Sequence, residues 1–90
     1  MGAIQAFGSN ALVWAGQRIE RSDNAQGRLL AKAAYLDYLA WCKRNGEGYC
    51  VSQHMVTMVV GRMARDLGGV ALRSNGTVFV GVRLKPAPAL

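Results

Sequence analysis

The sequence predicts one small α+β domain in which three helices precede a two-stranded antiparallel hairpin. Apolar residues recur with helical spacing over residues 31–44 and again over residues 52–67. Residues 70–84 instead alternate between apolar and polar side chains around the turn sequence Ser74-Asn75-Gly76. A chain of 90 residues is long enough for one hydrophobic core and too short for a second domain. We therefore expect a single domain over residues 1–90.

The first predicted helix spans residues 3–21, where the apolar pattern is loose. Gly8-Ser9-Asn10 interrupts it, so one frayed helix fits, and so does a turn followed by a helix capped at Ser9 or Asn10. Residues 22–27 have the composition of a loop. Arg28-Leu29-Leu30 can form a short strand that leads into the next helix.

The second predicted helix spans residues 31–44. Basic residues in its last turn complement the helix dipole, and Asn45-Gly46 is a left-handed stop. Its aromatic residues Tyr35, Tyr38 and Trp41 can in principle stack on nucleic acid bases. Their helical spacing is more typical of buried residues, so we expect them in the core.

The third predicted helix spans residues 52–67, with Ser52 as its N-cap and Gly68-Gly69 as its stop. A helical wheel separates a core side from an outward side on which every charge is positive. The core side holds Val56, Val59, Val60, Met63 and Leu67, and the outward side holds His54, Thr57, Met58, Gly61 and Arg65, with Arg62 beside it.

The hairpin over residues 70–84 has two conceivable loops. A two-residue Asn-Gly loop mixes apolar and polar side chains on each face, whereas a three-residue loop with left-handed Gly76 separates them, so we favour the three-residue loop. This register predicts an apolar inner face of Val70, Leu72, Val78, Val80, Val82 and Leu84, and an outer face of Arg73, Thr77, Phe79 and Arg83. Residues 86–90 are expected to form a frayed tail.

Charge indicates a polyanionic partner. The chain has a formal net charge of +6, and residues 62–90 alone carry five basic residues against Asp66. A basic footprint concentrated in one part of a domain is typical of nucleic-acid binding. The low charged fraction of 18% also leaves room for an apolar surface that binds a protein.

The order helix, short strand, helix, helix and hairpin is that of a winged helix-turn-helix. Residues 52–67 then stand in the position of the recognition helix, and residues 73–77 form the wing. Several segments resemble one family, the winged-helix domain at the C-terminal end of phage and plasmid primase-helicases of the poxvirus type. These segments are residues 28–46, Ser52-Gln53, Gly61-Arg62-Met63, Leu67-Gly68, Ser74-Asn75-Gly76 and residues 80–84.

This resemblance covers about residues 28–85 and implies a nucleic-acid-binding module from a mobile element. The family's ATPase and primase domains have no counterpart in these 90 residues, so the resemblance implies binding and no catalysis.

The predicted DNA-binding residues lie on the third helix and the wing. Small and hydrogen-bonding side chains on a helix can read base edges in a major groove, and arginines near a hairpin tip can bind phosphates. Gly61 costs about 1 kcal/mol in a helix, a cost that the close approach of another molecule explains. The alternative is an ordinary solvated face, with arginines that protect a strand edge. The candidate residues are Ser52, Gln53, His54, Thr57, Met58, Gly61, Arg62, Arg65, Arg73, Asn75 and Arg83.

The sequence predicts neither a metal site nor a catalytic site. Cys42, Cys50 and His54 are the only cysteines and histidine, one ligand short of a structural zinc site. No acid–base pair, nucleophile constellation or glycine-rich phosphate loop is present. We expect two reduced cysteines that pack as small hydrophobic residues, and a protein that is not an enzyme.

We therefore expect a phage or plasmid protein that binds double-stranded DNA in replication or transcriptional regulation. The alternative is a winged-helix interaction module, such as an inhibitor of a host defence or replication complex, whose outward Met55, Met58 and Phe79 contact a protein. A host protein target and a homodimer stay open as further partners. No apolar run is long enough for a signal peptide or a membrane span, so we expect a cytoplasmic protein without membrane contact.

Overall fold

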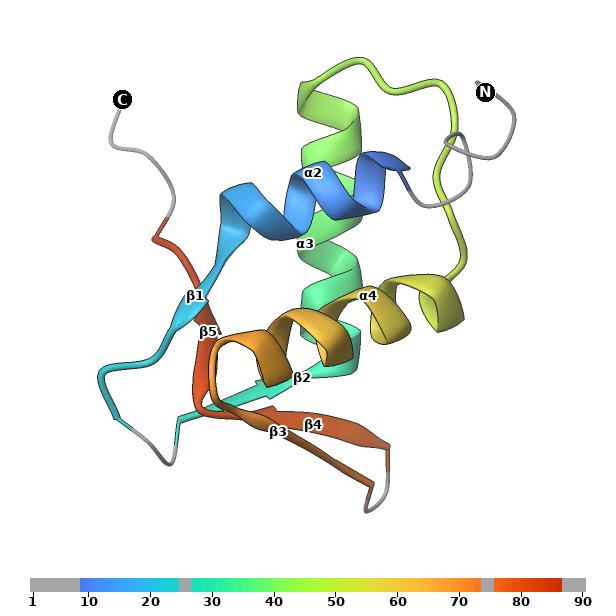
Figure 1. Cartoon of the computed structure of the whole chain (residues 1–90). Coiled ribbons are helices and arrows are strands. Elements are labelled where there is room, and N and C mark those ends of the chain that lie inside the picture. The colour runs from blue at the N-terminus through green and yellow to red at the C-terminus, as the bar shows by residue number, and fades with distance from the viewer. Residues whose placement is uncertain (1–8, 25–26, 74–75, 87–90) are drawn as a thin grey trace.

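The computed structural model describes residues 9–24, 27–73 and 76–86, which form a small α+β structure. In this part of the chain, α2 and α4 lie across α3, and a three-stranded sheet lies against α4 (Figure 1). The helices are α2 (Ser9–Arg18), α3 (Ala31–Arg44) and α4 (Gln53–Asp66), and the strands are β1 (Ile19–Arg21), β2 (Arg28–Leu30), β3 (Val70–Arg73), β4 (Thr77–Val80) and β5 (Val82–Leu84). The three helices and the antiparallel strands of the described residues confirm the predicted α+β class.

The helix predicted over residues 3–21 is shorter at its C-terminal end. It ends at Arg18, and β1 follows without a loop and pairs antiparallel with β5, Ile19 opposite Leu84. The prediction of helix through residue 21 was wrong because pairing with a strand more than 60 residues away overrides the local pattern. The predicted residues 3–8 lie outside the described part of the chain.

Helix α3 spans the predicted residues and forms the centre of the core. Gly46 follows it with a φ of 65°, the left-handed stop that the sequence indicates. Tyr38 is fully buried and Trp41 nearly so, and the two rings stack with centroids 6.5 Å apart. These aromatic residues therefore belong to the core, and they are not a surface for stacking bases.

The Tyr38 hydroxyl connects three segments. It donates to Asn10 Oδ1 in α2 and accepts from the backbone N–H of Val51 before α4, both at 2.8 Å. Burial raises the pKa of Tyr38 to about 12. The helical layer is thus held by a neutral phenol as well as by apolar packing.

Helix α4 begins after Ser52, whose Oγ accepts from the backbone N–H of Met55 at 3.3 Å. Val56, Val60 and Ala64 are fully buried along its inner side, and Gly68 follows its end with a φ of 87°. The predicted core stripe is observed, with its other members Val59, Met63 and Leu67 half-buried against the core.

The three-stranded sheet has the order β2-β4-β3. Strand β3 pairs with β4 in the register Val70–Val80 and Leu72–Val78, which is the register of the predicted three-residue loop. Gly76 has a φ of 111°. The short strand predicted from Arg28 is β2, and it pairs with the other side of β4.

Two predictions about the hairpin were wrong. Residues 77–84 do not form one strand, because Gly81 has a φ of 90° and separates β4 from β5, which pairs with β1 in a second sheet. The buried face of β4 is the reverse of the prediction: Phe79 is fully buried, while Val70 and Leu72 are about half exposed. Helix α4 packs on the Phe79 face, and Gly81 shifts the alternation so that Val82 is buried as well.

The two cysteines differ in their environment. Cys42 is buried in α3, as expected, whereas Cys50 is exposed in the loop before α4, so the expectation that both pack as small hydrophobic residues was wrong for Cys50. Both thiols are free. Of the predicted tail, Pro86 is held through its carbonyl, which accepts from Arg18 Nη1 at 3.3 Å, and residues 87–90 lie outside the described part.

Candidate nucleic-acid interface

A groove separates α4 from the β3–β4 hairpin. Its volume is about 630 Å³, and none of the described residues that line it is acidic. One wall is the outward side of α4 and the other is the hairpin, so two segments of the C-terminal half form the described part of the groove. The lining residues are Thr57, Met58, Gly61, Arg62, Arg65, Val70, Ala71, Thr77 and Phe79.

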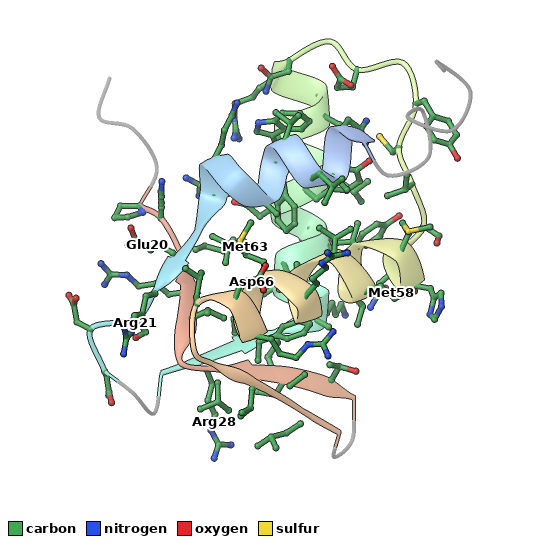
Figure 2. The ribbon with its side chains drawn as sticks, viewed as in Figure 1. Glu20, Arg21, Arg28, Met58, Met63 and Asp66 are labelled. Carbon is green, nitrogen blue, oxygen red and sulfur yellow. The ribbon has the colours of Figure 1, made fainter. Side chains whose placement is uncertain are left out.

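The wall from α4 consists of residues three and four apart, which share one side of a helix. Met58, in the N-terminal half of the helix, is 57% exposed (Figure 2), and the side chains of Arg62 and Arg65 are exposed as well. Because Val56, Val60 and Ala64 anchor the opposite side, the orientation of this wall follows directly from core packing. The structure thus brings five of the predicted site residues together in one groove wall.

The wall from the hairpin is set by strand register. Ala71 pairs with Phe79, and Thr77 lies two residues from Phe79 on β4, which places these three residues on the sheet face toward α4. The backbone of Arg73 pairs with that of Thr77 at the hairpin end of β3. Asn75, predicted at the tip of the wing, lies outside the described residues.

Gly61 and Phe79 meet at the floor of the groove. A Cβ placed on Gly61 would lie 3.7 Å from Cε1 of the Phe79 ring, which is ordinary van der Waals contact. The glycine is therefore not required by a clash inside the chain. Phe79 lies on the face of β4 that was predicted to be the outer one, where a lone phenylalanine is expected to pack against the third helix or a partner, and it is buried because α4 covers that face.

Several predicted site residues lie outside the groove. Ser52 uses its hydroxyl to cap α4, and Gln53 and His54 are exposed at the start of the helix. Met55, expected outward, is half-buried against the core.

Arg83 is separated from the wing because Gly81 moves β5 into the other sheet. Its Nε donates to Glu20 Oε2 at 2.6 Å, and its Nη2 lies 3.7 Å from Asp23 Oδ2. Figure 2 shows Glu20 on the opposite side of the view from Met58. The prediction that Arg83 shares an outer face with Arg73 was wrong, because Gly81 interrupts the single strand that was predicted over residues 77–84.

The hairpin residues Val70, Ala71 and Thr77 line the groove but were not among the predicted site residues. The signal in the sequence for Ala71 and Thr77 is Phe79. A large aromatic residue on a strand beside an amphipathic helix must pack on that helix, and in the three-residue-loop register its neighbours Ala71 and Thr77 then face the helix too.

Other kinds of site find no support among the described residues. Within residues 9–24, 27–73 and 76–86, no three histidine, cysteine or acidic side chains come together where they could hold a metal ion. In the same part of the chain no helix has both the length and the apolar character to cross a membrane.

Comparisons with known proteins add no relatives to this picture. No protein-family model, no curated protein and no solved structure matches the chain.

Proposed function

We propose that the chain is a DNA-binding protein of the winged-helix type, with α4 in the major groove and the β3–β4 hairpin on the phosphate backbone. The single observation that carries this proposal is the groove between these two elements, whose charged lining residues, Arg62 and Arg65, are both basic. An arginine on an exposed helix can donate to base edges or to phosphates, and the described lining of the groove, which holds no carboxylate, does not repel a polyanion.

The element order supports the same function. In a winged helix a short strand before the helix pair joins the sheet of the wing, and β2 pairs with β4 in this way. The resemblance of residues 28–85 to the C-terminal domain of phage and plasmid primase-helicases supports a role in replication or transcriptional regulation of a mobile element. The chain then acts by binding and not by catalysis.

The test is binding of the chain to fluorescently labelled duplex DNA, measured by anisotropy. We expect binding in low salt that Arg62→Ala and Arg65→Ala each weaken. The matched control is Arg44→Ala, which removes the same charge from an exposed position at the far end of α3. Weak binding in low salt, or an equal loss in all three variants, would contradict a specific role for the groove.

A second candidate function is protein binding by the same groove, for example inhibition of a host complex. The exposure of Met58 favours it, because methionine side chains adapt to varied apolar partners. Here we expect Met58→Glu to abolish capture of a host protein while Arg65→Ala does not. Phe79 is unsuitable for this test because its side chain is buried and a charge there would disrupt folding.

A further inference from the structure

Two free thiols lie beside each other near the C-terminal end of α3. Cys42 is buried in the helix, whereas Cys50 is exposed in the loop that leads into α4. The Cys42 thiol interacts both with the Cys50 thiol and with the Tyr38 hydroxyl. Neither cysteine lines the groove of the proposed function, so the pair calls for a separate role.

Hydrogen bonds hold the loop on both sides of Cys50. The backbone N–H of Val51 donates to the Tyr38 hydroxyl at 2.8 Å, and the backbone carbonyl of Tyr49 accepts from a side chain of α2 at 2.7 Å. Tyr38 and Cys42 are four residues apart and therefore share one side of α3. The loop thus returns along the side of α3 that carries Cys42, and the backbone of Cys50 is fixed between two anchored residues.

From this arrangement we propose that Cys42 and Cys50 form a reversible intramolecular disulfide when the chain reacts with a small-molecule disulfide such as oxidised glutathione. The bond joins α3 to the loop before α4. Because Ser52, the N-cap of α4, follows two residues after Cys50, the bond fixes the start of α4 against α3. The cysteine pair is then a redox-sensitive lock on the packing of these two helices, and it is independent of the proposed DNA binding.

The environments of the two thiols determine which of them reacts first. The thiolate is the form that attacks a disulfide, and the attack requires access. Burial raises the pKa of the Cys42 thiol and shields it from a dissolved reagent. Exposed Cys50 is therefore the attacking residue, and Cys42 is the residue that resolves the mixed disulfide.

The reaction then has two steps. The Cys50 thiolate bonds to one sulfur of oxidised glutathione and releases the other half as a thiol. The Cys42 thiol gives its proton to water, and its sulfur bonds to the Cys50 sulfur and releases the second glutathione thiol. The two cysteines together lose two protons and two electrons, and the glutathione disulfide gains them.

The test is equilibration of the whole chain, without DNA, in a glutathione redox buffer, followed by acid quenching, alkylation and peptide mass mapping. We expect one intramolecular disulfide between the two cysteines, which dithiothreitol reduces. We also expect its equilibrium constant to be about tenfold or more larger in the folded chain than in urea, because the fold holds the thiols side by side. Equal constants in the two states would overturn the proposal. Two thiols that stay free, a glutathione adduct that persists on the parent chain, or a disulfide between two chains would overturn it too.

Single variants test the order of the steps. Cys42→Ala retains the exposed thiol, and we expect it to accumulate one glutathione per chain because the resolving thiol is missing. Cys50→Ser retains the buried thiol, and we expect it to react about tenfold or more slowly than Cys42→Ala when folded and at a similar rate in urea. Circular dichroism verifies that both variants fold, and the measurement on the parent chain needs neither. Equal rates for the two folded variants, or no adduct on Cys42→Ala, would contradict the assigned order.

Discussion

Gly61 stands in the middle of α4, where glycine is less favourable than alanine by about 1 kcal/mol. Its replacement by alanine meets no obstacle, since the added Cβ would lie 3.7 Å from the Phe79 ring. We expect Gly61→Ala to raise the free energy of unfolding by about 1 kcal/mol in urea titrations. We also expect it to weaken DNA binding, because the methyl group narrows the floor of the groove. A loss of stability would mean that Phe79 cannot accommodate the methyl group.

Buried and outward residues of the helices should respond differently to substitution. Trp41 is nearly buried in α3 and Val60 fully buried in α4, whereas Arg65 is exposed and Thr57 only half-buried. Loss of a large buried aromatic side chain costs about 3–5 kcal/mol, a large part of the stability of a small domain. We expect Trp41→Ala and Val60→Asp to unfold the chain or lower its melting temperature strongly, while Thr57→Ala and Arg65→Ala leave it nearly unchanged. Thermal melts measure this, and equal losses for Arg65→Ala would show that α4 presents a different face.

Between elements, Asp37 connects α3 to α2. Its carboxylate accepts from Trp14 Nε1 at 2.9 Å and from Arg18 Nε and Nη2 at 3.0 and 3.2 Å. Burial by itself would raise the pKa of Asp37. The hydrogen bonds from Arg18 and Trp14, together with the charge of Arg18, outweigh burial and lower it.

The lowered pKa of Asp37 makes the contact between α2 and α3 sensitive to acid. The folded chain favours the ionised carboxylate, so its contribution is complete above the ordinary carboxyl pKa and is lost as the pH falls through the folded-state pKa. We expect Asp37→Asn to be less stable than the parent at neutral pH, with a difference that shrinks in acid. Urea titrations at several pH values measure this difference. A constant difference at all pH values would contradict the role of the charge.

At the scale of the whole molecule, the DNA proposal makes a prediction about salt. Arg83 is paired with Glu20 away from the groove, which leaves Arg62 on α4 and the predicted wing residue Arg73 as candidate phosphate contacts. Each contact contributes about −0.9 to the slope of log affinity against log salt, so two give about −1.8.

Single variants should show which arginine contributes to the salt dependence of DNA binding. We expect Arg73→Ala, at the hairpin, to make the slope shallower by about 0.9. Arg65→Ala should instead reduce discrimination between DNA sequences by about 1–3 kcal/mol, because Arg65 lies on the helix proposed to read bases. Anisotropy titrations over a salt series with specific and random duplexes separate the two effects. A slope that Arg73→Ala leaves unchanged would contradict a phosphate contact from the hairpin.

The helical part of the candidate site could be predicted because an α-helix repeats locally. Once Val56 and Val60 are assigned to the core, the directions of Thr57, Gly61 and Arg65 follow from 100° per residue. For the hairpin part of the site, the sequence predicted the strand register but not which face of the sheet is buried. Alternation alone cannot say which of two faces is buried when one carries valines and leucines and the other carries a single phenylalanine, and here the phenylalanine face packs on α4.

The sequence by itself determined the α+β class, the positions of α3 and α4, the three-residue loop register and the aromatic core of α3, because each follows from contacts between residues close in the chain. Only the tertiary structure decided that Ile19–Arg21 is a strand, that Gly81 divides the last strand, and that Arg83 pairs with Glu20 instead of joining the wing. These features depend on segments more than 60 residues apart. These segments pair because their pairing buries the apolar side chains of the whole core together. A pattern within one short stretch of sequence carries no information about such distant contacts.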